Sequence, residues 1–300
     1  MPTWLIWAFV ALFSWGVWAV LSKLLGSALS AEQSQALSTI GFLPIVAPLA
    51  WSGRERVRSA SRKGLLLALA GGVVSCLGNI PYYAALARGE KFATVLSLVA
   101  LAPLVTVLLA VLVLRERLNF QQMAGLALAA VAIWLFNISD GTALLSPVVL
   151  VALAPIALWG LSGFLQKVAT NFVSVEAAAL AYLGAFLPMG VYYAASEPWP
   201  GNLPVQTWLV VIALGFFLAF GNFAVLAAYA RQGKASVIAP LVNLFPVVSI
   251  GIALLLGETV GKREWAGIVC ALIAVLALSW ETRIGEPNLV KSETNPHEKH

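Results

Sequence analysis

One stretch of this sequence occurs twice in related form. Residues 87–125 read ARGEKFATVLSLVALAPLVTVLLAVLVLRERLNFQQMAG, and residues 230–267 read ARQGKASVIAPLVNLFPVVSIGIALLLGETVGKREWAG. Each copy carries a small residue after a short loop, a proline inside an apolar run, a glutamate that closes the run and a glycine early in the next run. Further matches at offsets of 142–144 residues include Trp15-Gly16 with Trp159-Gly160, Phe42-Leu43-Pro44 with Phe186-Leu187-Pro188, and Gly78-Asn79 with Gly221-Asn222. Two single-residue gaps align the whole chain with itself, so the sequence predicts a duplicated fold.

The composition indicates a protein of the lipid bilayer. Of the 300 residues, 61% are hydrophobic and 10% are charged, whereas roughly a quarter of a soluble protein is charged. Apolar runs of about 20 residues suit membrane-crossing helices. We therefore predict an all-α integral membrane fold with ten transmembrane helices, near residues 3–25, 32–51, 64–87, 92–114, 121–138, 147–169, 176–195, 205–230, 235–256 and 264–281. Residues 282–300 are polar and aperiodic, which predicts a disordered tail.

The loop charges predict how the two repeats are oriented. Residues 3–138 and 147–281 each hold five predicted helices, so the second repeat enters the membrane from the opposite side. The loop at 54–63 carries five positive charges, and its counterpart at 197–206 carries none. Because cytoplasmic loops of membrane proteins carry the Lys and Arg excess, we expect inverted repeats in the inner or plasma membrane. Both termini and the tail are then cytoplasmic.

Other protein classes find little support in the sequence. Cys76 and Cys270 lie inside apolar runs, and His297 and His300 lie in the tail, so no disulfide framework and no histidine-based metal site is expected. The acidic residues fall at predicted helix ends, in loops or in the tail, which argues against an enzyme, and no cofactor is expected. The net charge of +5 is scattered between apolar runs, so no nucleic-acid partner is expected. The oligomeric state stays open, a monomer included.

The doubled stretch resembles the EamA repeat of the drug/metabolite transporter superfamily. The resemblance covers about residues 3–281. It implies ten helices and a secondary transporter for a small metabolite, amino acid-like or drug-like, with export as the expected direction and alternating access between the repeats. One alternative is an exchanger of anionic or phosphorylated metabolites that uses basic residues at helix ends, Lys23, Arg88, Lys167 and Arg231. An integral-membrane enzyme and a structural scaffold are more remote alternatives.

Polar and aromatic residues deep in the predicted helices are the candidates for solute binding, since such residues face a bundle interior or a watered cavity. Trp15, Trp18 and Ser22 share one helix face, and the repeat gives a second face of altered chemistry. The candidate cavity residues are Trp15, Trp18, Ser22, Asn79, Tyr83, Trp159, Ser162, Gln166, Asn222 and Asn243. For the tryptophans the alternative is packing between helices, and for Asn79 and Asn222 it is hydrogen bonding between helices.

Two further sets of matched residues have structural or gating roles in this interpretation. The intramembrane prolines Pro44, Pro103, Pro188 and Pro246 each remove a backbone hydrogen bond and bend their helices. The bend either sets a static shape or serves as a gate when one repeat moves against the other. Glu116 and Glu258 stand beside cations and are expected to organise helix–loop–helix corners.

Overall fold

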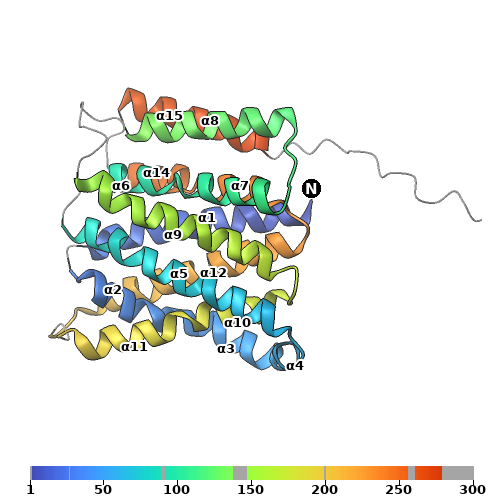
Figure 1. The fold of residues 1–300 in the computed structure, drawn as a ribbon. Helices are drawn as coiled ribbons and strands as arrows, with labels where there is room; N and C mark the ends of the chain where they lie inside the picture. The colour runs from blue at the N-terminus through green and yellow to red at the C-terminus, as the bar shows by residue number, and fades with distance from the viewer. Residues whose placement is uncertain are drawn as a thin grey trace, which may run out of the picture.

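The computed structural model describes residues 2–26, 28–88, 92–137, 147–198, 201–255 and 261–278. These residues form helices and connecting turns, without a strand among them (Figure 1). The elements are α1 (Thr3–Leu25), α2 (Ala31–Ser38), η1 (Thr39–Phe42), α3 (Leu43–Ser52), α4 (Arg54–Arg58), α5 (Arg62–Ala87), α6 (Phe92–Val99), α7 (Ala102–Val113), α8 (Phe120–Asn137), α9 (Pro147–Ala169), α10 (Val175–Gly184), α11 (Phe186–Ser196), α12 (Val205–Ala230), α13 (Ala235–Val242), α14 (Pro246–Leu255) and α15 (Lys262–Leu278).

The apolar runs form these helices, and serine caps mark where two of them begin. Ser30 accepts a hydrogen bond from the Gln33 N–H, and the Gln33 side chain accepts from the Ser30 N–H. Ser174 caps α10 at the equivalent place in the second half by accepting from the Ala177 N–H. Within the described residues, six helical stretches are long and apolar enough to cross a membrane: Thr3–Leu25, Ala31–Ser52, Arg62–Ala87, Val175–Ser196, Val205–Ala230 and Ala235–Ile252. Shorter apolar helices accompany them at Ala102–Val113, Phe120–Ala132, Leu153–Ala169 and Trp265–Ala274.

The matched prolines stand where four of the predicted helices are divided into two segments. Pro44 and Pro103 occupy the first turns of α3 and α7. Pro188 lies in the first turn of α11, and Pro246 opens α14. A proline is tolerated in the first turn of a helix, where its missing N–H has no helical acceptor to lose. The helices are therefore interrupted near these prolines, and not only bent.

Glycines let the two halves approach each other, and they do so in matched pairs. A Cβ atom on Gly215 of α12 would lie 1.8 Å from the Ser38 carbonyl oxygen, and one on Gly72 of α5 would lie 2.1 Å from that of Tyr182. The alignment at 143–144 residues matches Gly72 with Gly215 and Ser38 with Tyr182. Residues matched in this way are called repeat-mates below. This close contact between the halves is thus made twice with the halves exchanged, as expected for a two-fold relation.

The long helices pack in pairs. Helix α1 packs along α12, and the equivalent pair with the halves exchanged is α9 packed along α5. Helices α8 and α15 pack against each other at one edge of the bundle (Figure 1). Large apolar side chains on this pair are exposed, among them Phe120, Trp134 and Leu276. Such a surface suits lipid, which is as apolar as these side chains.

Candidate functional site

A cavity between the two halves collects most of the polar residues that the sequence singled out. Eight of the ten candidates line it: Trp15, Trp18, Asn79, Trp159, Ser162, Gln166, Asn222 and Asn243. Ser75, Thr106, Tyr182, Tyr229 and Phe245 are among the other lining residues. The interior space is about 60 Å³, which is room for a few water molecules or a small solute. The lining comes from α1, α5, α7, α9, α10, α12 and α13 together with the turn after α13, so both halves contribute.

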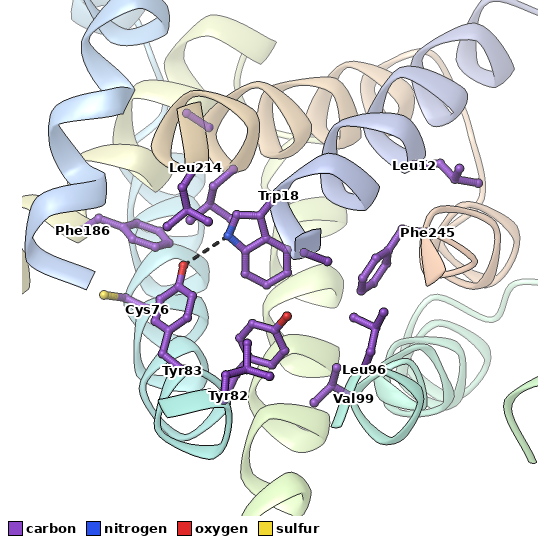
Figure 2. Close-up of a cluster of buried hydrophobic side chains, with 14 of the residues drawn as sticks. Leu12, Trp18, Cys76, Tyr82, Tyr83, Leu96, Val99, Phe186, Leu214 and Phe245 are labelled. Atoms are coloured by element: carbon purple, nitrogen blue, oxygen red, sulfur yellow. Dashed lines mark hydrogen bonds between the residues drawn. The ribbon is translucent and has the colours of Figure 1, made fainter. Parts of the chain in front are cut away.

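The other two candidates, Ser22 and Tyr83, lie in an aromatic cluster behind the cavity wall. The Trp18 indole stacks on Tyr82 with ring centroids 5.0 Å apart, and its Nε1 donates to the Tyr83 hydroxyl at 3.2 Å (Figure 2). The Ser22 hydroxyl is 2.9 Å from the Tyr82 hydroxyl and donates to the Ala19 carbonyl. Figure 2 shows Trp18 between Tyr83 and Phe245, so Trp18 joins this cluster to the cavity. Ser22 and Tyr83 therefore support the wall without lining the space.

On the side of Trp159 the cavity wall is held by a chain of hydrogen bonds. Trp159 Nε1 donates to the Asn79 Oδ1 at 3.1 Å and to the Ser75 carbonyl at 3.2 Å. The Asn79 amide nitrogen then donates to Gln35 Oε1 at 3.1 Å. Asn79 thus both joins helices and lines the cavity, so the two roles open at the sequence level coincide here.

The hydrogen bonds on the equivalent side of the cavity, at Trp15, are different. Asn222, the repeat-mate of Asn79, donates its amide to the Leu218 carbonyl of its own helix at 2.8 Å. Its oxygen accepts from Gln166 Nε2 at 3.4 Å. Trp15 Nε1 and Gln166 Oε1 are buried and have no hydrogen-bond partner among the described residues. Asn243 lies at the break between α13 and α14 and donates to the Ala239 carbonyl of its own helix.

Two lining residues that the sequence analysis did not select, Tyr182 and Thr106, make contacts between helices. Tyr182 is within 3.1 Å of the Ser162 hydroxyl, which donates to the Gly71 carbonyl. Thr106 donates to the Gly160 carbonyl at 2.7 Å. Its repeat-mate Ser249 donates to the Gly16 carbonyl at 3.0 Å. The Thr106–Ser249 match is a signal in the sequence that could have marked this pair, whereas Ser75 and Tyr182 have apolar and small repeat-mates.

Glu116 bonds the start of α13, which belongs to the other half. Its carboxylate accepts from the backbone N–H groups of Ala235 and Ser236 at 3.0 and 2.9 Å, and also from the Ser236 hydroxyl. These are the first residues of α13, where free N–H groups and the helix dipole favour an anion. Glu258 lies outside the described residues.

Most of the basic residues near helix ends make contacts within the protein. Lys167 Nζ donates to the Gly233 and Tyr229 carbonyls at 3.0 and 3.5 Å, and Lys234 Nζ donates to the Arg117 carbonyl. Arg231 donates to the Ala227 carbonyl and stands 5.1 Å from the Trp7 ring. Lys23 stands 5.3 Å from the Phe92 ring, and Arg88 ends α5 with an exposed side chain. Among the described residues none of the side chains that line the cavity is charged.

Metal and disulfide chemistry have no visible basis in the described part of the chain. No group of three or more His, Cys, Asp or Glu lies there in a position to hold a metal ion. Cys76 and Cys270 are free thiols.

The comparison with protein families identifies what kind of protein builds this cavity. The model of the EamA-like transporter family matches residues 2–138 and, a second time, residues 146–280. The chain belongs to the EamA-like transporter family. As a member it is an integral membrane protein and a transporter of the drug/metabolite superfamily, acting on a small-molecule solute in a lipid environment. The duplicated pattern that the sequence analysis compared with the EamA repeat is confirmed by this double match.

Solved structures agree on the fold. Twenty-four solved chains match significantly. One, titled "Crystal structure of protein", has a TM-score of 0.72 and 20% sequence identity over 93% of this chain and 96% of its own. At that identity the likeness concerns the fold alone. No curated protein matches the sequence significantly.

Proposed function

We propose that this EamA-family protein is a ten-helix secondary transporter that moves a small metabolite by alternating access between two inverted repeats. The observation that carries the proposal is the cavity of uncharged polar and aromatic residues to which both halves contribute. Binding at the interface of repeats, beside interrupted helices, is the usual arrangement in transporters of this kind. Asn243 at the break between α13 and α14 exemplifies it.

The orientation of the repeats has support from charge and from the placement of the chain ends. The N-terminus and α4, with its cluster of arginines, lie at the same end of the bundle in Figure 1. The chain passes from α11 to α12 at the opposite end. With cytoplasmic termini, this arrangement agrees with the positive-inside distribution of loop charges.

The anion-exchanger alternative receives less support. It requires basic side chains that can turn toward a solute, but Lys167 donates to two backbone carbonyls and lies outside the cavity lining. Breaking those bonds would leave the carbonyls of two buried residues, Tyr229 and Gly233, without this donor, which costs free energy.

A solute screen followed by flux in liposomes tests the proposal. Solutes that stabilise the purified protein against heat are expected to be carried by proteoliposomes, with export as the working direction. Asn243→Leu should lower the transport rate while leaving the melting temperature within a few degrees of the original. Asn171→Leu makes the same change at an exposed turn and should leave transport unchanged. Equal flux through both variants and the parent protein would contradict the assignment of the cavity as the transport site.

A further inference from the structure

The two matched tryptophans of the cavity wall, Trp15 and Trp159, differ in the hydrogen bonding of their indole N–H groups. Trp159 Nε1 has two acceptors within the protein, whereas Trp15 Nε1 is buried and has none among the described residues. Both indoles sit against a glycine of the other half: a Cβ on Gly78 would lie 2.6 Å from Trp159 Nε1, and one on Gly221 would lie 2.5 Å from Trp15 Nε1. The glycine contact is therefore equivalent on the two sides, whereas the hydrogen bonding of the two indoles differs.

The difference follows from two substitutions between the repeats. In the first half, Gln35 accepts the amide hydrogen of Asn79, and this leaves the Asn79 oxygen turned toward Trp159. The repeat-mate of Gln35 is Ala179, which has no acceptor in its side chain. Asn222 therefore bonds the Leu218 carbonyl of its own helix.

The second substitution replaces Ser22 of the first half by Gln166 in the other. Gln166 Nε2 donates to the Asn222 oxygen, so this oxygen is already engaged by a donor other than Trp15. The same bond leaves Gln166 Oε1 buried without a partner among the described residues. Gln166 also lies near the Tyr182 hydroxyl, which bonds Ser162. Trp15 and Gln166 both belong to the wall of this cavity, so the wall holds one unused donor and one unused acceptor, each covered by neighbouring atoms.

We propose that Trp15 and Gln166 are the specificity-determining pair of this cavity, and that they select a small uncharged solute carrying both a hydrogen-bond acceptor and a donor. Because neighbouring atoms cover both groups, the two side chains turn toward the solute when it binds: Trp15 Nε1 then donates to the acceptor of the solute, and Gln166 Oε1 accepts from its donor. A primary carboxamide is the simplest group of this kind. This inference rests on the proposed transport function, because it assigns the chemistry of the same cavity.

The surroundings of the pair favour an uncharged ligand. Burying a polar group without a partner is costly, so an unused donor and acceptor in a cavity select a ligand that completes them. An ion would need a counter-charge in this apolar setting. Within the described lining no side chain supplies one, and Lys167, next to Gln166 in the chain, is held by backbone carbonyls instead.

The experiment compares three probes of similar size, propionamide, propionate and propylammonium, by thermal stabilisation and calorimetry on the purified full chain. Propionamide is expected to bind and the two ions are not. In Trp15→Phe, propionamide should bind about fivefold more weakly, the value of one hydrogen bond, while the melting temperature stays equal or rises. Gln166→Met should weaken propionamide binding as well.

Two matched variants separate recognition from folding. Trp159→Phe removes an indole N–H whose bonds are made within the protein, so it should lower the melting temperature. Trp134→Phe removes the same group from an exposed residue of α8 and should change neither the melting temperature nor the affinity for propionamide. Tighter binding of an ion, or equal propionamide affinity in Trp15→Phe and the parent, would overturn the inference while leaving transport intact. Failure of every solute class to bind or cross would overturn the proposed function itself.

Discussion

Gly215 shows how a single hydrogen atom in place of a side chain sets the distance between the halves. We predict that Gly215→Ala lowers stability by about 1–3 kcal/mol or more, because the added Cβ overlaps the Ser38 carbonyl oxygen and forces the backbones apart. Thermal unfolding of the purified protein measures the loss. Gly184→Ala is the matched control: a Cβ there meets nothing within 4 Å, and the change should raise stability by up to about 1 kcal/mol. Similar melting temperatures for the two variants would refute the close approach.

Thr106 and its repeat-mate Ser249 offer a second test of the contacts between the halves. We predict that Thr106→Val costs about 1 kcal/mol, since the Gly160 carbonyl loses its buried donor while the side-chain volume stays nearly constant. The free energy of unfolding in denaturant measures it. Ser249→Ala should cost less, because Ser249 divides its hydroxyl between the Gly16 carbonyl and the Phe245 carbonyl of its own helix. The reverse order would show that the contact between the halves is not what Thr106 supplies.

For single residues, the sequence predicts which side chains line the cavity better than it predicts which hydrogen bonds each of them makes. Asn79 and Asn222 look equivalent in the alignment, and their side chains both line the cavity. Their bonding differs because Gln35 is opposite one and Ala179 is opposite the other. This difference in hydrogen bonding depends on neighbours that are distant in the chain. The pattern of residues along one helix therefore cannot predict it.

Among the elements, α13 depends on a residue of the other half for its start. We predict that Glu116→Ala lowers stability by about 1–3 kcal/mol, because three donors at the beginning of α13 lose a carboxylate. Glu116→Gln should recover part of the loss through its remaining oxygen. Glu55→Ala removes an exposed carboxylate from α4 and should have little effect. A loss no larger than that of Glu55→Ala would mean that the cap contributes nothing to folding.

The elements themselves were largely predictable, and their joints were not. Apolar runs of suitable length place the long helices within a few residues of their observed bounds, since the bilayer leaves helices as the spanning structure for such runs. The prolines mark the interrupted helices for a reason visible in the chain, the missing N–H. For Glu116 the sequence predicts a role at a helix–loop–helix corner, but it does not show that the carboxylate caps α13 from 119 residues away. A short helix at a break needs an acceptor from somewhere, and only the folded chain shows from where.

For the whole molecule, the central expectation is that the homologous loops at 54–63 and 197–206 face opposite sides of the membrane. Single cysteines would be placed in each loop of a variant in which Cys76 and Cys270 are replaced by alanine. An impermeant thiol reagent applied from outside should label the loop at 197–206 in intact cells and the loop at 54–63 only after permeabilisation. Labelling of both loops from the same side would exclude inverted repeats. Because Cys76 is fully buried, the melting temperature of the cysteine-free variant should be checked first.

The hydrogen bond between Asn79 and Gln35, which the other half lacks, has an energetic consequence for a carrier that alternates. If the halves were identical, the state open to one side and the state open to the other would be the same structure with the halves exchanged, and each would hold half of the population. A bond worth about 1 kcal/mol that only one half makes shifts such a ratio by about fivefold when the bond persists in one state alone. A few substitutions of this size are enough for the empty protein to spend most of its time facing one compartment. In the proposed alternating-access cycle, sequence divergence after duplication would thus set a resting direction without changing the fold.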